Sequence, residues 1–293
     1  MRLLFVSALL AGLAAPALAQ QRTLTTPRVS PHAHVEQTVG LTELSVDYHR
    51  PAVRGREVFG GLVKWDEVWR AGANENTVFE ASTDVVVEGE PLAAGRYGLH
   101  VIPRETGAWT VIFSTFADAW GSYFYDEAED ALRVEVTPMA APAQEHLAYR
   151  IDPTADGALV TLHWAEIALP FRIDIDTDAV VLASMERELR SVPGFFAEAW
   201  DQIARYALDA GTRLEDALSW SDASIGRQAS FANRMTKVGL LTALGRAEEA
   251  DRLRDEAFAN ADEGEVRAWA RTRQRAGDEA GAQEALDRIA SGG

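Results

Sequence analysis

Residues 147–175 read LAYRIDPTADGALVTLHWAEIALPFRIDI, and this stretch decides which kind of fold the chain adopts. Apolar side chains occupy every second position in three runs: Leu147, Tyr149 and Ile151; Val160, Leu162 and Trp164; Leu169, Phe171, Ile173 and Ile175. A period of two is typical of β-strands with one buried face. Asp-Pro and Asp-Gly pairs separate the first two runs and are turn signals. The stretch therefore predicts antiparallel strands joined by tight turns.

The same alternation extends back along the chain as far as Val35. It recurs from Leu44 to Tyr48, from Tyr97 to Val101 and from Leu132 to Val136, and no helical pattern interrupts the series. Many short strands with regular turn signals predict an all-β antiparallel sandwich, jelly-roll-like in type. We place this domain at residues 35–178, after an extended N-terminal segment at residues 20–34.

Residues 184–293 have a different period and predict an α-helical hairpin domain. Ala, Leu, Glu and Arg recur there at helical spacing, and a glycine marks each repeat at Gly211, Gly245 and Gly277. This spacing resembles that of tetratricopeptide repeats, whose unit is a pair of helices of about 34 residues. The resemblance implies that the helical tail docks a protein partner. A simple helical cap on the sandwich is the alternative.

The N-terminus has the pattern of a secretory signal at residues 1–19. Arg2 provides the positive charge, an apolar run follows, and Ala17-Leu18-Ala19 forms a small-x-small cleavage site. We expect a mature chain that begins at Gln20, has no membrane span and lies in the periplasm or is secreted. A retained membrane anchor is the alternative. The chain has no cysteine, so no disulfide stabilises it.

The charge balance excludes some partners and makes one loop conspicuous. The chain has 28 Lys and Arg against 45 Asp and Glu, a net charge of −17, which argues against nucleic acid and anionic membranes. Residues 49–64 oppose this trend, because they contain three arginines and Lys64 but only one acidic residue, Glu57. Arginine offers planar, bidentate donors for carboxylate, phosphate or sulfate.

The glycine-rich segment of residues 50–77 is the candidate ligand site. Its arginines suit an anion, its tryptophan can stack on a sugar, and its asparagines donate and accept hydrogen bonds. The alternative is a buried structural network in which each arginine pairs with a carboxylate and Arg70 pairs with Glu75 or Glu67. The candidate ligand-binding residues are Arg50, Arg54, Arg56, Trp69, Arg70, Asn74, Glu75 and Asn76.

Metal and cofactor signals are weak by comparison. His32 and His34 project to the same side of an extended segment, and Asp47 or His49 would complete a metal site. No third ligand has a motif spacing, so we expect neither a metal nor a cofactor. The chain also lacks the nucleophile-elbow, zinc-protease and phosphate-loop motifs.

Several segments together resemble a bacterial exported family, number 2911 among the domains of unknown function. The resemblance covers about residues 28–175 and implies no activity, cofactor or substrate. A serine takes the place of His49 in the family pattern, which argues against chemistry that depends on His49. The matching segments include Tyr48-His49-Arg50-Pro51-Ala52-Val53-Arg54-Gly55-Arg56, Val68-Trp69-Arg70-Ala71-Gly72-Ala73-Asn74-Glu75-Asn76-Thr77, Gly95-Arg96-Tyr97, Trp109-Thr110-Val111-Ile112-Phe113 and Trp120-Gly121-Ser122-Tyr123.

Two functions are consistent with these residues. The first is a non-enzymatic envelope protein that binds a polar or anionic small ligand or a glycan on the sandwich, and we prefer it because no nucleophile-base motif is present. The second is a glycan or ester hydrolase, with Glu75 as general acid or base and Arg70 stabilising negative charge. The hydrolase requires a second carboxylate or a histidine near Glu75, for which Asp47, Asp66 and Glu67 are the candidates.

Overall fold

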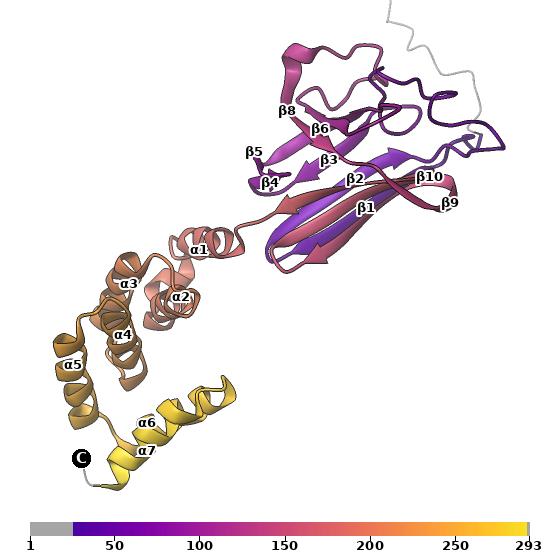
Figure 1. Cartoon of the computed structure of the whole chain (residues 1–293). Helices are drawn as coiled ribbons and strands as arrows, with labels where there is room; N and C mark the ends of the chain where they lie inside the picture. The colour runs from indigo at the N-terminus through magenta and orange to yellow at the C-terminus, as the bar shows by residue number, and fades with distance from the viewer. Residues whose placement is uncertain (1–25, 292–293) are drawn as a thin grey trace, which may run out of the picture.

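The computed structural model describes residues 26–291 and has two regions (Figure 1). All the strands lie within residues 32–174, the strand region, and the α-helices lie within residues 177–290, the helical region. The helical region extends away from the strands in Figure 1. The predicted signal peptide at residues 1–19, its cleavage near Ala19 and the mature start at Gln20 lie outside the described residues.

The strands form two antiparallel sheets, which confirms the predicted fold class, and neither sheet closes into a barrel within the described residues. The first sheet has the order β1-β2-β3-β6-β7-β8, with β1 (His32–Val39), β2 (Thr42–His49), β3 (Thr77–Ala81), β6 (Gly95–Ile102), β7 (Trp109–Ser114) and β8 (Asp130–Val136). The second has the order β5-β4-β10-β9, with β5 (Glu90–Leu92), β4 (Val85–Val87), β10 (Gly157–Asp174) and β9 (Met139–Thr154).

The apolar residues that alternate in the sequence form one core in the strand region. Leu44 and Val46 of β2 are fully buried, as are Leu162 and Phe171 of β10. Burying one such side chain contributes about 1.5–3 kcal/mol relative to leaving it exposed. The hydrophobic pattern therefore fixes which face of each strand points inward.

The stretch that predicts the fold forms one long hairpin. The first run lies on β9, but the second and third runs both lie on β10, where the pattern predicts two separate strands. The register between the two strands shifts on either side of Ala165, which has a φ of 51°. A bulge therefore interrupts the alternation without ending the strand.

The helical region starts with α1 (Thr177–Glu188) and continues as three helical hairpins. Each hairpin turns at one of the repeated glycines, and Gly211, Gly245 and Gly277 have φ values of 66°, 75° and 84°. The conformation suits glycine, which has no Cβ. Their relation to tetratricopeptide repeats stays a prediction. The hairpins are α2 (Ala197–Ala210) with α3 (Leu214–Arg227), α4 (Phe231–Ala243) with α5 (Ala247–Asn260), and α6 (Glu263–Arg275) with α7 (Glu279–Ala290).

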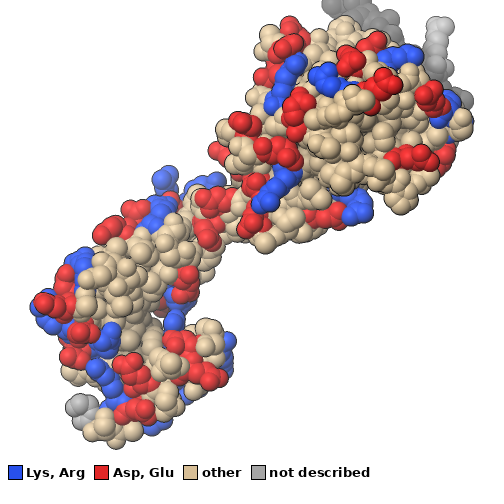
Figure 2. All heavy atoms as spheres, viewed as in Figure 1, with Lys and Arg blue, Asp and Glu red and all other residues tan. Residues whose placement is uncertain are grey.

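The two regions meet at α1. Val180 packs against the core of the strand region, and a Cβ on Gly40 would lie 2.8 Å from the Thr177 side chain. The space-filling view shows acidic and basic side chains distributed over both regions (Figure 2). Charge alone therefore does not mark a site, and the candidate residues have to be located through their contacts.

Candidate functional site

The loop of residues 50–77 connects β2 to β3 and is anchored to both sheets. On one side, the Val53 amide donates to the Glu145 carbonyl of β9 at 2.8 Å. On the other side, Trp69 exchanges two backbone hydrogen bonds of 2.8 Å with Val101 of β6. The loop therefore leaves the first sheet at β2, contacts the second sheet at β9 and returns to the first sheet at β6.

A pocket of about 320 Å³ opens beside this loop, within the size range of small-molecule sites. We call it the arginine pocket. Five of the eight candidate residues line it, and three of these are arginines; the candidates Arg50, Glu75 and Asn76 do not belong to its lining. The lining residues are Val29, Ser30, Pro51, Ala52, Arg54, Arg56, Leu62, Val63, Trp69, Arg70, Gly72, Ala73, Asn74 and Trp164.

Two arginines of the pocket donate to backbone carbonyl groups. Arg56 Nη2 donates to the Ala52 carbonyl at 2.5 Å and its Nε donates to the Val53 carbonyl at 3.0 Å. Arg70 Nη1 donates to the Asn74 carbonyl at 2.5 Å. These contacts use one or two of the five donors of each guanidinium. The remaining donors form no hydrogen bond within residues 26–291.

The other two arginines of the loop differ in position. Arg50 Nε donates to the Leu147 carbonyl at 2.9 Å, outside the pocket lining. The Arg54 side chain is exposed at the pocket and forms no hydrogen bond within residues 26–291. No carboxylate within residues 26–291 lies within ion-pair distance of these four arginines. The alternative in which each arginine pairs with an acid is therefore wrong.

Two tryptophans form the apolar wall of the arginine pocket. Trp69 and Trp164 stack with ring centroids 5.8 Å apart and planes inclined by 23°. Trp69 Nε1 donates to the Gly72 carbonyl at 3.1 Å. Trp164 is 1% exposed, and its Nε1 has no partner within the described residues. A buried donor without an acceptor costs free energy. The fold bears this cost at the Trp164 indole nitrogen, in the wall of the pocket.

The asparagines hold the loop in place. Asn74 has a φ of 60°, and its Nδ2 donates to the Ser30 carbonyl at 3.2 Å, which ties the N-terminal segment to the pocket. Asn76 is buried, and its Nδ2 donates to the Phe116 carbonyl at 3.4 Å. The Asn76 Oδ1 has no partner among residues 26–291. Asn74 is therefore a pocket residue, whereas Asn76 lies in the packed interior.

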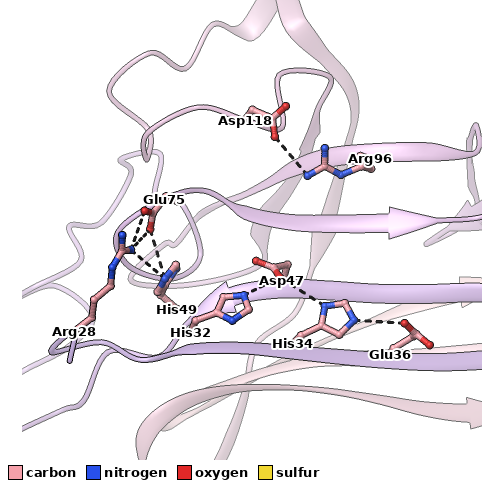
Figure 3. A network of polar contacts seen from close by, with 9 residues as sticks. All are labelled: Arg28, His32, His34, Glu36, Asp47, His49, Glu75, Arg96 and Asp118. Atoms are coloured by element: carbon pink, nitrogen blue, oxygen red, sulfur yellow. Dashed lines mark hydrogen bonds and ion pairs between the residues drawn. The ribbon is translucent and has the colours of Figure 1, made fainter. Parts of the chain in front are cut away.

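Glu75 lies outside the pocket in a network of polar contacts (Figure 3). Its carboxylate accepts two hydrogen bonds from Arg28 Nη1, at 2.8 and 2.5 Å. The hydrogen bonds from Arg28 lower the pKa of the Glu75 carboxyl. His49 Nε2 lies 3.5 Å from the same carboxylate. Glu75 thus contacts Arg28 and His49, and it is not paired with Arg70 as the structural alternative expected.

Histidines extend this network along β1 and β2 (Figure 3). His32 Nε2 lies 2.8 Å from Asp47 Oδ2, and His34 Nδ1 lies 3.6 Å from the same atom. His49 is buried, and loss of hydration lowers its pKa. Within residues 26–291, no group of three or more metal-binding side chains has a geometry that could hold a metal ion.

Three features of the site have no clear signal in the sequence. Arg28 precedes the candidate loop by more than twenty residues, and it reaches the network through Glu75 and through His49 Nε2, which lies 3.3 Å from Arg28 Nη1. Trp164 occupies an ordinary strand position, so its place in the pocket wall depends on tertiary packing. His100 is buried, and its Nδ1 lies 3.0 Å from Ser122 Oγ in the loop that contains Tyr123, which packs on Arg70.

No helix within residues 26–291 is long and apolar enough to cross a membrane. Searches of curated proteins and of solved structures found no match to this chain. A family model described as "Protein of unknown function (DUF2911)" matches residues 30–173. The matched segment runs from just before β1 to the end of β10 and includes the arginine pocket. The comparison thus supports the resemblance found in the sequence over the strand region.

Proposed function

We propose that the strand region is a binding module for a small anionic ligand, which it takes into the arginine pocket. The observation that carries this proposal is that Arg54, Arg56 and Arg70 line one pocket and have no carboxylate partner within the described residues. The chain has other arginines without an acidic partner, but these three line the same pocket, where their positive charges lie close together. A carboxylate, phosphate or sulfate group supplies the missing negative charge.

The pocket wall supports the same ligand class. An anion can accept hydrogen bonds from guanidinium groups, and charged hydrogen bonds contribute about 1.5–3 kcal/mol each. The stacked pair of Trp69 and Trp164 offers an apolar or sugar-binding surface next to these donors. We therefore propose a ligand that combines an anionic group with an apolar or glycan body.

We prefer binding to hydrolysis because of the position of Glu75. A hydrolytic role for Glu75 requires a reacting group held between it and Arg70, but its carboxylate is engaged by Arg28 and does not line the pocket. The lining of the arginine pocket contains no Asp, Glu or His. His49, 3.5 Å from Glu75, meets the requirement for a histidine near that carboxylate, so the glycan or ester hydrolase stays the alternative, at a place outside the arginine pocket.

The wider role that we propose is that of an exported envelope protein with a docking tail. A groove of about 770 Å³ in the helical region is lined by residues of α2 and of α4 to α7, including Phe258 and Trp269. This groove is the proposed docking surface for a protein partner. A photo-crosslinker at Thr272, in the groove wall, should capture that partner, and one at Thr161 on β10 should not.

A thermal-shift experiment tests the anion site directly. Phosphate, sulfate, acetate and a neutral hexose are compared at constant ionic strength, and an anion at 100 times its Kd should stabilise the fold by about 2.7 kcal/mol. Arg54→Gln should weaken this shift without lowering the melting temperature of the free protein, because its side chain makes no hydrogen bond within the described residues.

Arg150→Gln is the matched control, because Arg150 lies on the same region but pairs with Asp152 at 2.5 Å. It should leave the anion-induced shift unchanged. An equal shift in wild type and in the double variant Arg54→Gln, Arg56→Gln would show that anions act through general screening and would contradict the proposal.

A further inference from the structure

A second pocket adjoins the arginine pocket and has the opposite charge. It has a volume of about 440 Å³, and Arg56 belongs to the lining of both pockets. Its apolar lining includes Val58, Phe59, Trp65 and Ile167. Three glutamates also line it: Glu57, Glu145 and Glu166. We call it the glutamate pocket.

The glutamates resemble the pocket arginines in that they lack partners of opposite charge. Within residues 26–291, no Lys, Arg or His side chain lies within ion-pair distance of Glu57, Glu145 or Glu166. Glu145 Oε1 instead accepts a hydrogen bond from the Arg54 backbone amide at 3.0 Å, which places this carboxylate next to the arginine pocket. Charges of both signs thus remain unpaired on the two sides of Arg56.

A distortion of β10 connects the two pockets. Trp164 lines the arginine pocket, whereas Ala165, Glu166 and Ile167 line the glutamate pocket. Between them, the register with β9 shifts twice and Ala165 has a φ of 51°. A non-glycine residue with left-handed backbone costs energy, and bulges of this kind turn side chains toward new directions. The bulge distributes consecutive side chains of one strand between the two pockets.

We propose that the two pockets form one site for a zwitterionic ligand with an apolar body, such as a short peptide with free ends. This inference rests on the proposed anion site and names its ligand class. The carboxylate binds at Arg54 and Arg56, the apolar body lies on Phe59 and Trp65, and the ammonium group binds among the glutamates.

Each part of this ligand matches a separate feature of the site. A guanidinium binds a carboxylate through two parallel hydrogen bonds. Glutamates accept hydrogen bonds from an ammonium group, and the face of Trp65 attracts a cation that approaches it. An anion without an ammonium group would bind at the arginines only and leave the three glutamates of the second pocket without a partner. The site therefore selects ligands that carry both a carboxylate and an ammonium group.

Four peptides separate the two charges experimentally. The dipeptide Leu-Leu carries both, N-acetyl-Leu-Leu only the carboxylate, Leu-Leu-amide only the ammonium group, and N-acetyl-Leu-Leu-amide neither. Calorimetry on the full chain, with tryptophan fluorescence as a second readout because Trp65 and Trp69 line the pockets, gives their affinities. We expect Leu-Leu to bind at least ten times more tightly than either singly capped peptide, and the doubly capped peptide to bind weakest.

Two substitutions assign each charge to its pocket. Glu166→Gln should weaken Leu-Leu about tenfold and leave N-acetyl-Leu-Leu unchanged, because only the first carries an ammonium group. Arg54→Gln should weaken Leu-Leu and N-acetyl-Leu-Leu alike and leave Leu-Leu-amide unchanged. Glu105→Gln is the control, because Glu105 is exposed on the strand region and lines neither pocket; it should change nothing.

The outcomes separate this inference from the anion site. Equal affinities for Leu-Leu and N-acetyl-Leu-Leu, or an equal effect of Glu166→Gln on both, would overturn the zwitterion site and leave the anion site standing. Equal affinities for Leu-Leu and Leu-Leu-amide would overturn both, because the carboxylate would then contribute nothing. Absence of binding by all four peptides would overturn the zwitterion site, and the response to phosphate and sulfate would then decide the anion site alone.

Discussion

Arginines of the helical region that pair with carboxylates have the same chemistry as the arginines of the 50–77 loop, but the loop arginines have no acidic partner within the described residues. In the helical region, Arg213 pairs with Glu186 and Asp216, and Arg273 pairs with Asp278. In the loop, Arg56 and Arg70 donate only to backbone carbonyl groups. Arginines of the first kind are neutralised within the fold. Arginines of the second kind have no acidic partner within residues 26–291, and our proposal that the strand region binds a ligand rests on this difference.

The largest expected effect comes from removing a tryptophan in each region. Trp164→Ala should destabilise the strand region by about 3–5 kcal/mol, because Trp164 is fully buried and its loss leaves a cavity. Trp200→Ala should cost less, because the Trp200 ring is half-buried and packs under Arg227. Urea denaturation followed by circular dichroism measures both. A larger loss for Trp200→Ala would show that the helical region, and not the sandwich, dominates stability.

Acid should change the stability of the strand region more than that of the helical region, because every histidine in the chain precedes residue 177. His100 is 2% exposed, and burial lowers its pKa from an ordinary 6.5 to about 4. Between these values the unfolded chain binds more protons, so folding stability is complete above pH 6.5 and is lost as the pH falls toward 4. The expected loss is about 3 kcal/mol for this residue.

Denaturation curves recorded between pH 7 and pH 4 test this expectation. His100→Gln should flatten the pH dependence, because glutamine carries no charge at any of these pH values. His146→Gln serves as the control, because His146 is exposed. The same slope in His100→Gln as in wild type would contradict the assignment.

The sequence predicts the secondary structure of both regions better than it predicts the site. Alternation along β2 and β10, and the repeated glycines of the helical region, are local signals that follow from strand and helix geometry. The arginine pocket is non-local, because Trp164 of β10 and the arginines of the loop are about one hundred residues apart in the sequence and meet only in the fold. Eight candidates came from one segment, and whether each lines the pocket depends on how the loop crosses between the sheets. Composition alone could not show that the arginines lack acidic partners.

A smaller effect should follow from neutralising one arginine of each kind. Arg213→Gln removes two ion pairs and a contact with the Trp220 ring, and it should cost the helical region about 1 kcal/mol, less at high salt. Arg54→Gln should leave stability unchanged, because its side chain has no partner within residues 26–291. Thermal denaturation at low and high salt measures both. A loss of stability in Arg54→Gln would show that this arginine is structural after all.

The smallest expected effect concerns the ion pair that ties the N-terminal segment to the loop. Arg28 and Glu75 are half exposed, with side chains 52% and 40% accessible, so Glu75→Gln should cost less than about 1 kcal/mol. The substitution should have a clearer effect on the pKa of His49. The Glu75 carboxylate raises the pKa of His49 against the larger opposing effect of burial, so Glu75→Gln should lower that pKa further.

An NMR titration of the His49 ring, with Glu80→Gln as the control, measures this change. Glu80 pairs with Arg96 and does not contact His49, so its replacement should leave the titration of His49 in place. If the pKa of His49 did not fall in Glu75→Gln, the contact between the two side chains at 3.5 Å would not persist in solution. The N-terminal segment would still be held beside the arginine pocket by the hydrogen bond from Asn74 to the Ser30 carbonyl and by the one from the Arg50 amide to the Pro31 carbonyl, so the role of His49 in the network, and not the position of the segment, would be in question.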